Sequence, residues 1–235
     1  MKKISTMHSV LISDFVYGGI DGAVTTFAVV AGVYGASLSP GIVLVLGFAN
    51  LFADGFAMAV GNYLGTKSHI ELANKIRRSE ENSIIEKPEE EREEISEIYK
   101  QKGFSGDHLE KTVNVITRDK KIWIDTMMTD EFGIMEETKS PLKAALVTFL
   151  AFNIIGIIPL FSYLLSYVSP FFKENAFTSS IIFTSFALFL VGSIKANIVD
   201  KKWYRSGFET FMIGGVAAAI AYFVGYSLKG FAVGF

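Results

Sequence analysis

The chain contains no cysteine and only three histidines. The lack of cysteine excludes disulfides, thiolate zinc sites and cysteine-ligated iron–sulfur clusters. His8, His69 and His108 are scattered, and none has a glutamate three residues before it, so the Glu-x-x-His pair of ferritin-like di-iron proteins is absent. The H-E-x-x-H, Walker A and G-x-S-x-G motifs are also absent. Nothing in the sequence therefore indicates hydrolysis or ATP use, and we do not expect an enzyme or a prosthetic group.

Charge is scarce over most of the chain, in which 50% of the 235 residues are hydrophobic. Several uncharged runs are long enough to cross a bilayer, which predicts an integral membrane protein. Residues 66–140 are the exception, with 18 of the 24 acidic residues and 13 of the 22 lysines and arginines. An acidic segment of this kind disfavours a nucleic-acid partner and suits a surface that handles cations.

The apolar runs predict an all-α membrane protein with five spans, interrupted by one acidic module of three amphipathic helices. We place the transmembrane parts at 1–65, with spans one and two, and at 141–235, with spans three to five; the module occupies 66–140. The second span is expected to continue as a helix into the module, whose loops we expect near Lys87 and at 103–107. Gly156 and Pro159 should kink the third span or mark a close neighbour. The expected spans are 15–37, 40–64, 142–168, 177–198 and 208–228.

The distribution of lysine and arginine in short loops predicts the orientation. Lys2 and Lys3 precede the first span, and three further basic residues lie in the loop between spans four and five. This places the N-terminus and the acidic module in the cytosol. We expect a multi-pass protein of the plasma (inner) membrane in a prokaryote, or of a vacuole-like organelle in a eukaryote.

The second span carries three side chains with potential ligand atoms at a spacing of four: Asn50, Asp54 and Met58. This spacing places an amide, a carboxylate and a thioether on one helical face. A carboxylate at the bilayer centre costs roughly 2.5–3.5 kcal/mol on insertion scales, so it usually faces an ion, a partner or a water-filled path. Oxygen and sulfur donors together suit a borderline transition metal better than Ca²⁺. The alternative is helix packing, with Met58 as an apolar filler.

Asp21 is the corresponding residue of the first span, on one face with Asp14, Gly18 and Thr25. It can be an ion ligand, a proton carrier or a group that bonds another helix. The G-x-x-x-G spacings at Gly18 and at Gly61 predict close helix contacts, within a protomer or across a dimer.

The acidic module combines carboxylates with methionines. Glu91 and Glu94 share a helical face, and Met127 and Met128 precede Glu131 by about one turn. Carboxylates that converge from several helices form metal sites, and thioethers disfavour Ca²⁺. The alternative is a solvated helix face, the commonest role of a charge run.

Residues 21–32 (DGAVTTFAVVAG) and 50–64 (NLFADGFAMAVGNYL), with the acidic insert that ends in 123–133, resemble the vacuolar iron transporter (VIT) family over essentially the whole chain. The resemblance implies a homodimer that exchanges Fe²⁺ or Mn²⁺ for protons and carries the ion between the two first helices.

The resemblance also implies roles for individual residues. Asp21 would be the carboxylate of the path and Met58 its thioether. Three positions depart from the family pattern: Asn50, Ser83 and Met128 each replace a carboxylate, which bears on the ion count and proton stoichiometry rather than on the fold. The implied cytosolic ligands are Glu80, Glu91, Glu94, Met127 and Glu131.

The leading hypothesis is a proton-coupled antiporter that exports Fe²⁺, and Mn²⁺ as a second cargo, from the cytosol, with Zn²⁺ and Co²⁺ as further candidates. One alternative is a membrane-tethered ferroxidase, which the missing Glu-x-x-His pairs disfavour. Another is an acidic metal-binding or sensing protein that the membrane part only anchors, which leaves Asp21, Asp54 and Met58 without a role.

Overall fold

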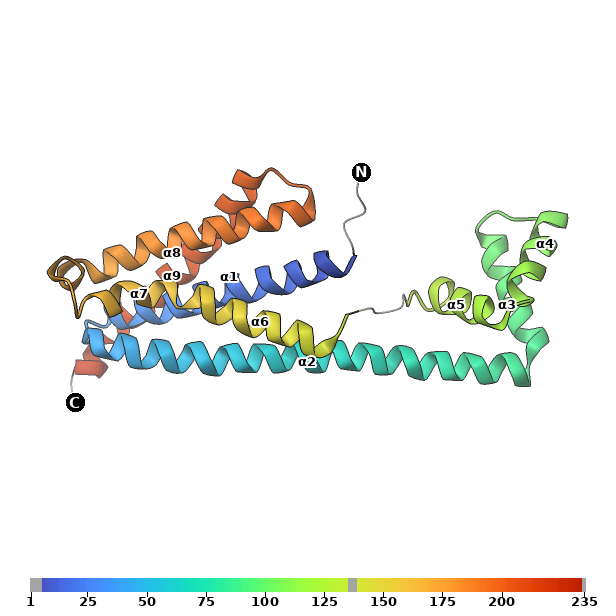
Figure 1. The fold of residues 1–235 in the computed structure, drawn as a ribbon, viewed down its shortest axis with the longest axis horizontal. Helices are drawn as coiled ribbons and strands as arrows, with labels where there is room; N and C mark the ends of the chain where they lie inside the picture. Colours follow the sequence, from blue (N-terminus) through green and yellow to red (C-terminus); the bar gives the residue numbers. More distant parts are fainter. Residues whose placement is uncertain (1–5, 135–138, 234–235) are drawn as a thin grey trace. The chain divides into compact units, whose positions relative to one another are not determined.

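Five helical segments are long and apolar enough to span a membrane within the part of the chain that the structure describes. The structure is a computed structural model that describes residues 6–134 and 139–233 (Figure 1). These residues form helices joined by turns, without a strand, as predicted. Lys2 and Lys3, which support the predicted orientation, lie outside the described residues. The segments are α1 (Thr6–Gly35), α2 (Pro40–Glu86), α6 (Pro141–Gly156) with α7 (Ile158–Leu165), α8 (Pro170–Val199) and α9 (Trp203–Val233).

The chain divides into two compact units, a membrane unit of residues 1–64 and 139–235 and an insert of residues 65–138. Helix α2 contributes to both units, because it runs without interruption for 47 residues. At 1.5 Å per residue it is about 70 Å long, more than twice the roughly 30 Å thickness of the hydrocarbon core. The expected continuation of the second span into the insert is therefore confirmed, and we assign residues 40–64 to the membrane.

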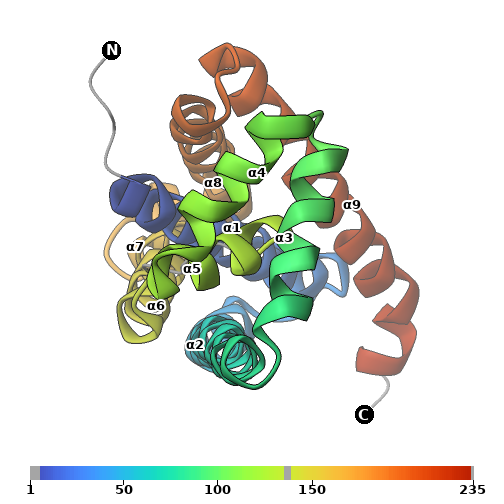
Figure 2. The same cartoon turned by 90° about the vertical axis from the view of Figure 1, so that its right-hand side faces the viewer.

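Helix α1 packs against α6, α8 and α9, which lie around it in Figure 2. Two glycines allow the close approach to α6. A Cβ atom on Gly18 would lie 2.6 Å from the carbonyl oxygen of Thr148, and one on Gly22 would overlap the backbone of Phe152. The first G-x-x-x-G pair thus joins helices within the protomer. Phe27, Val30 and Ala31 continue α1 into the hydrophobic core of the membrane unit.

The third span breaks where predicted, between α6 and α7. Ile157 separates the two helices, and Pro159 occupies the first turn of α7, where its missing N–H is not needed. The hydroxyl of Ser180 on α8 donates a hydrogen bond of 2.6 Å to the carbonyl of Pro159. Helix α8 begins earlier than its predicted span and is kinked at Asn175.

The insert contains the end of α2 and three short helices, α3 (Pro88–Gln101), α4 (Gly106–Thr117) and α5 (Lys120–Asp130). The expected breaks at Lys87 and after Gly103 are both present, and Gly103 has a positive φ of 96°. The side chain of Asp119 caps α5 by accepting hydrogen bonds from two backbone N–H groups. The helices enclose an apolar core of their own, made of Ile84, Ile95, Val113, Ile116, Trp123, Ile124, Met127 and Met128.

Candidate metal path and acidic site

The polar face of α2 lies beside the row of residues that packs α2 into the membrane unit. Leu51 contacts Gly156, and Gly55 contacts Phe152. Asn50 and Asp54 each precede a member of this row by one position, so their side chains point about 100° away from it. Asn50 and Met58 are half-buried, and Asp54 is exposed on the surface of the protomer.

Asp21 of α1 faces the same region. Its carboxylate lies close enough to that of Asp54 for the two charges to repel each other. The Thr25 hydroxyl donates to the backbone carbonyl of Asp21 at 2.8 Å and not to the side-chain carboxylate. Two acidic side chains from two helices therefore approach each other inside the span, which is costly unless a cation or a proton is shared between them.

The amide nitrogen of Asn50 is buried and has no hydrogen-bond partner among the described residues. Buried polar groups are nearly always paired, so such an atom usually marks a bound water, an ion or a partner surface. Asn50, Asp54 and Met58 thus share a face as predicted, with Asp21 opposite Asp54. The ligand roles of these four residues remain predictions.

One polar cluster of the membrane unit was only partly anticipated. Asp14 was expected on the same face of α1 as Asp21, but its partners Asn62, Thr148 and Lys139 were not. The signal available in the sequence was an asparagine, Asn62, one turn beyond Met58 in an apolar helix. No local pattern links it to Lys139, which is far away along the chain.

In the insert, four carboxylates lie within electrostatic reach of one another. They come from three places: Glu80 from α2, Glu91 and Glu94 from α3, and Glu131 from the end of α5. Glu80 and Glu91 are buried, and one carboxylate oxygen of Glu91 has no hydrogen-bond partner among the described residues. Helices distant in sequence thus bring together the carboxylates named in the sequence analysis.

Their pKa values reflect this crowding. Burial raises the pKa of Glu80 to about 7, and the charges of Glu91, Glu131 and Glu94 contribute to the increase. Burial also raises the pKa of Glu91, helped by Glu94 and Glu90 and opposed by Lys87 and by a hydrogen bond with Ser83. The pKa of Glu131 is raised for the same reasons, burial first and then Glu94 and Glu91. With a pKa of about 7, Glu80 is partly protonated near neutral pH, and a bound cation could displace that proton.

The two methionines occupy a different environment. Met127 is fully buried and Met128 nearly so, both in the apolar core of the insert. Packing in this core explains the burial of both side chains without a metal, so a purely structural role is the alternative to a ligand role. No three His, Asp or Glu side chains of the described residues lie close enough together to bind one ion as placed. The metal-ligand role of the cluster, with Met127 and Met128, stays a prediction.

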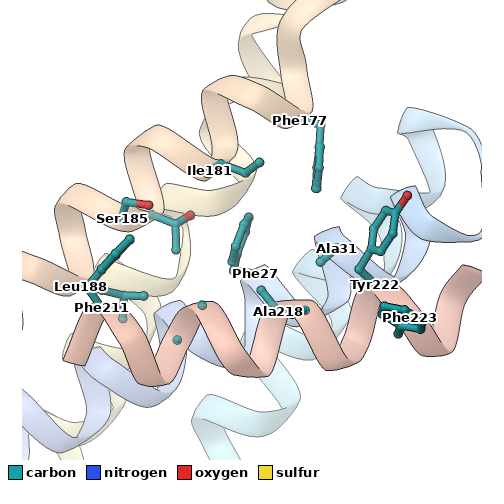
Figure 3. Close-up of a pocket in the computed structure, with 14 residues that line it drawn as sticks. Phe27, Ala31, Phe177, Ile181, Ser185, Leu188, Phe211, Ala218, Tyr222 and Phe223 are labelled. Atoms are coloured by element: carbon teal, nitrogen blue, oxygen red, sulfur yellow. The ribbon is translucent and has the colours of Figure 1, made fainter. Parts of the chain in front are cut away.

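The membrane unit also contains an apolar cavity of about 420 Å³ between α1, α8 and α9 (Figure 3). Phe27 and Ala31 line it from α1, Phe177 and Ile181 from α8, and Tyr222 from α9. Its walls offer almost no oxygen or sulfur donors, so this cavity does not suit the passage of a metal ion.

The family model described as "VIT family" matches residues 12–226. The chain is similar to the vacuolar iron transporter of Toxoplasma gondii, with 35% identity over 233 residues, covering 94% of this chain and 77% of the relative. It is also similar to vacuolar iron transporter 1 of Arabidopsis thaliana, with 34% identity over 213 residues, covering 90% of this chain and 84% of the relative. The match covers both the spans and the acidic insert. The chain therefore belongs to the VIT family.

Proposed function

We propose that this protein is a homodimeric, proton-coupled antiporter that moves Fe²⁺, and Mn²⁺ as a second cargo, out of the cytosol. The relatives are named iron transporters, which supports the choice of iron. The observation that carries the proposal is the exposed Asp54, on one face with the half-buried Asn50 and Met58 and within electrostatic reach of Asp21. A hydrocarbon-facing carboxylate is unfavourable, whereas one that lines an ion path is not.

In the proposed dimer, the second protomer covers the side of the path on which Asp54 is exposed. Beyond Asp54 on α2, a Cβ atom on Gly61 would have no neighbour within 4 Å among the described atoms. The large side chains of Phe52 and Phe56 are also exposed, 58% and 64% respectively. A second copy packed on this surface would remove Asp54 from lipid and bring two sets of donors together. Small residues such as Gly61 allow the close helix contact that such packing needs.

Proton coupling follows from the paired acids. A divalent cation at Asp21 and Asp54 stabilises their charged forms, whereas without the cation their mutual repulsion favours uptake of a proton. Metal and proton therefore compete for the same oxygens, which is the requirement for exchange. The thioether of Met58 would favour Fe²⁺ and Mn²⁺ over Ca²⁺, because sulfur is a poor ligand for hard ions.

The acidic insert would collect the metal on the cytosolic side. Its buried carboxylates, Glu80 and Glu91, together with Glu94 and Glu131, form a negative field that raises the local cation concentration. Zn²⁺ and Co²⁺ are further ions that such a site could take. We place the protein as a multi-pass protein in the plasma membrane of a prokaryote or in a vacuole-like membrane of a eukaryote.

Proteoliposomes that contain the purified protein test this function directly. We expect Fe²⁺ flux to increase when a proton gradient drives protons in the direction opposite to the metal. Proton release should accompany metal uptake. A flux that ignores the pH gradient but follows the membrane potential would indicate a uniporter. Oxygen consumption on addition of Fe²⁺, without flux, would indicate the ferroxidase.

A further inference from the structure

A buried ion pair in the membrane unit includes Lys139, the first residue after the insert. The ammonium of Lys139 is 2.8 Å from Oδ1 of Asp14, and the two side chains are only 17% and 8% exposed. Asp14 belongs to α1, while Lys139 directly precedes α6, so the pair joins positions 125 residues apart. A carboxylate this deeply buried needs a positive partner, and Lys139 supplies it.

Asn62 of α2 bonds Asp14 directly and links it to Thr148 of α6. The side-chain amide of Asn62 on α2 donates to Oδ1 of Asp14 at 3.0 Å and to the hydroxyl of Thr148 on α6 at 2.8 Å. The ammonium of Lys139 also donates to the amide oxygen of Asn62, at 3.5 Å. The second carboxylate oxygen of Asp14, Oδ2, is buried and has no hydrogen-bond partner among the described residues. Oxygens from α1 and α2 thus contact one ammonium group, and Asn62 links them to the hydroxyl of Thr148 on α6.

This group of oxygens is aligned with the proposed path. Asp14 precedes Asp21 by seven residues, about two helical turns on the same face of α1. Asn62 follows Met58 by four residues on α2. The two helices that supply the path residues therefore also supply this cluster, two turns from Asp21 on α1 and one turn from Met58 on α2.

We propose that Asp14, Asn62 and Thr148 form a mouth site for the transported cation, and that the ammonium of Lys139 occupies it until a divalent ion displaces it. The inference rests on the proposed transport function. Lys139 keeps Asp14 neutralised between transport events, so the helix ends are not left with an uncompensated buried charge. Because Lys139 lies just before α6 begins at Pro141, its side chain can leave without breaking a helix.

Displacement is a competition between two cations for one carboxylate. A divalent ion is more strongly attracted to Asp14 than an ammonium is, but it must first lose part of its hydration shell. Lys139 therefore raises the metal concentration that is needed to fill the mouth site. Its removal should strengthen metal binding there and slow the release of metal into the path.

The test compares Lys139→Gln with Lys143→Gln, which removes an exposed lysine of α6 four residues away. We expect Lys139→Gln to lower the apparent KM for Fe²⁺ flux about fivefold or more, which is the lower end of the usual coupling between two binding events. Its maximal rate should fall as well. Lys143→Gln should keep both values. An unchanged KM in a folded Lys139→Gln protein would overturn the inference.

The double variant Asp14→Asn/Lys139→Gln separates a mouth site from a purely structural ion pair. It removes both charges and should fold even if Lys139→Gln does not. We expect it to transport with a KM higher than that of the wild type, because the mouth carboxylate is lost. If instead the double variant regains wild-type KM and rate, the pair is only structural and the inference fails. Wild-type protein without any metal flux would count against the proposed function itself, before either variant is compared.

Discussion

Asp21 is the residue on which the proposed path depends most. Asp21 is half-buried in α1. Within the described residues, the charge of Asp54 acts on its carboxylate. We expect Asp21→Ala to reduce Fe²⁺ flux to the level of empty liposomes, because the ion loses its main charged ligand. Folding should be largely kept, since a carboxylate in the span costs stability rather than adding to it.

Flux in proteoliposomes and melting in detergent measure the two effects separately. Glu174→Gln, which removes an exposed carboxylate at the beginning of α8, is the matched control and should transport normally. Near-normal flux in a well-folded Asp21→Ala protein would remove Asp21 from the path.

Glu80 is the residue whose titration should be visible in metal binding. Its pKa is raised to about 7, so the metal-free protein holds a proton there that the metal must displace. We expect Mn²⁺ affinity to increase as the pH is raised through 7 and to level off about one pH unit above the pKa of Glu80. Glu80→Gln should bind more weakly and lose most of this pH dependence. Calorimetry on the full-length protein, with Mg²⁺ as the comparison ion, measures both.

The same shift has a consequence for stability. An acid whose folded pKa lies above its unfolded value binds more protons in the folded state between those values, about 4.5 and 7. Without metal, the free energy of unfolding should therefore fall as the pH is raised through this range, and added Mn²⁺ should restore it. A solvated acidic face would show neither effect and would bind Mg²⁺ and Mn²⁺ alike, with strong salt dependence.

At the scale of elements, the contact between α1 and α6 depends on the absence of a side chain at Gly22. A Cβ atom there would overlap the backbone of Phe152, which cannot move without displacing α6. We expect Gly22→Ala to destabilise the membrane unit by about 1–3 kcal/mol, the usual cost of overpacking. Gly215→Ala on α9 is the control, because its Cβ meets nothing within 4 Å. Equal melting temperatures for the two variants would contradict this contact.

At the scale of the whole molecule, the absence of cysteine makes the proposed dimer easy to test. We expect Gly61→Cys to form an oxidised dimer in membranes, because this face of α2 would meet its copy in the partner. Ile182 on α8 is 60% exposed in the protomer but lies on a different helix. The Ile182→Cys variant should therefore remain monomeric on gels. The reverse pattern would place the interface on α8 and leave Asp54 uncovered.

The sequence alone was enough for the features that depend on neighbours along the chain. Uncharged runs predicted the five spans, because burial in lipid requires an apolar surface over the whole length of a helix. Gly156 and Pro159 predicted the break between α6 and α7, and the second span continues as a helix beyond Leu64, as expected. Spacing also placed Asn50, Asp54 and Met58 on one face.

Only the tertiary structure decided which groups face each other. It paired Asp14 with Lys139, brought Glu80 near Glu91 and Glu131, and buried Met127 in an apolar core. It also left Asp54 on the surface of the protomer while Leu51 and Gly55 pack inward. These outcomes depend on helix contacts between residues tens of positions apart, whose free energies no local pattern contains. Periodicity determines which face a residue occupies, and packing determines what that face meets.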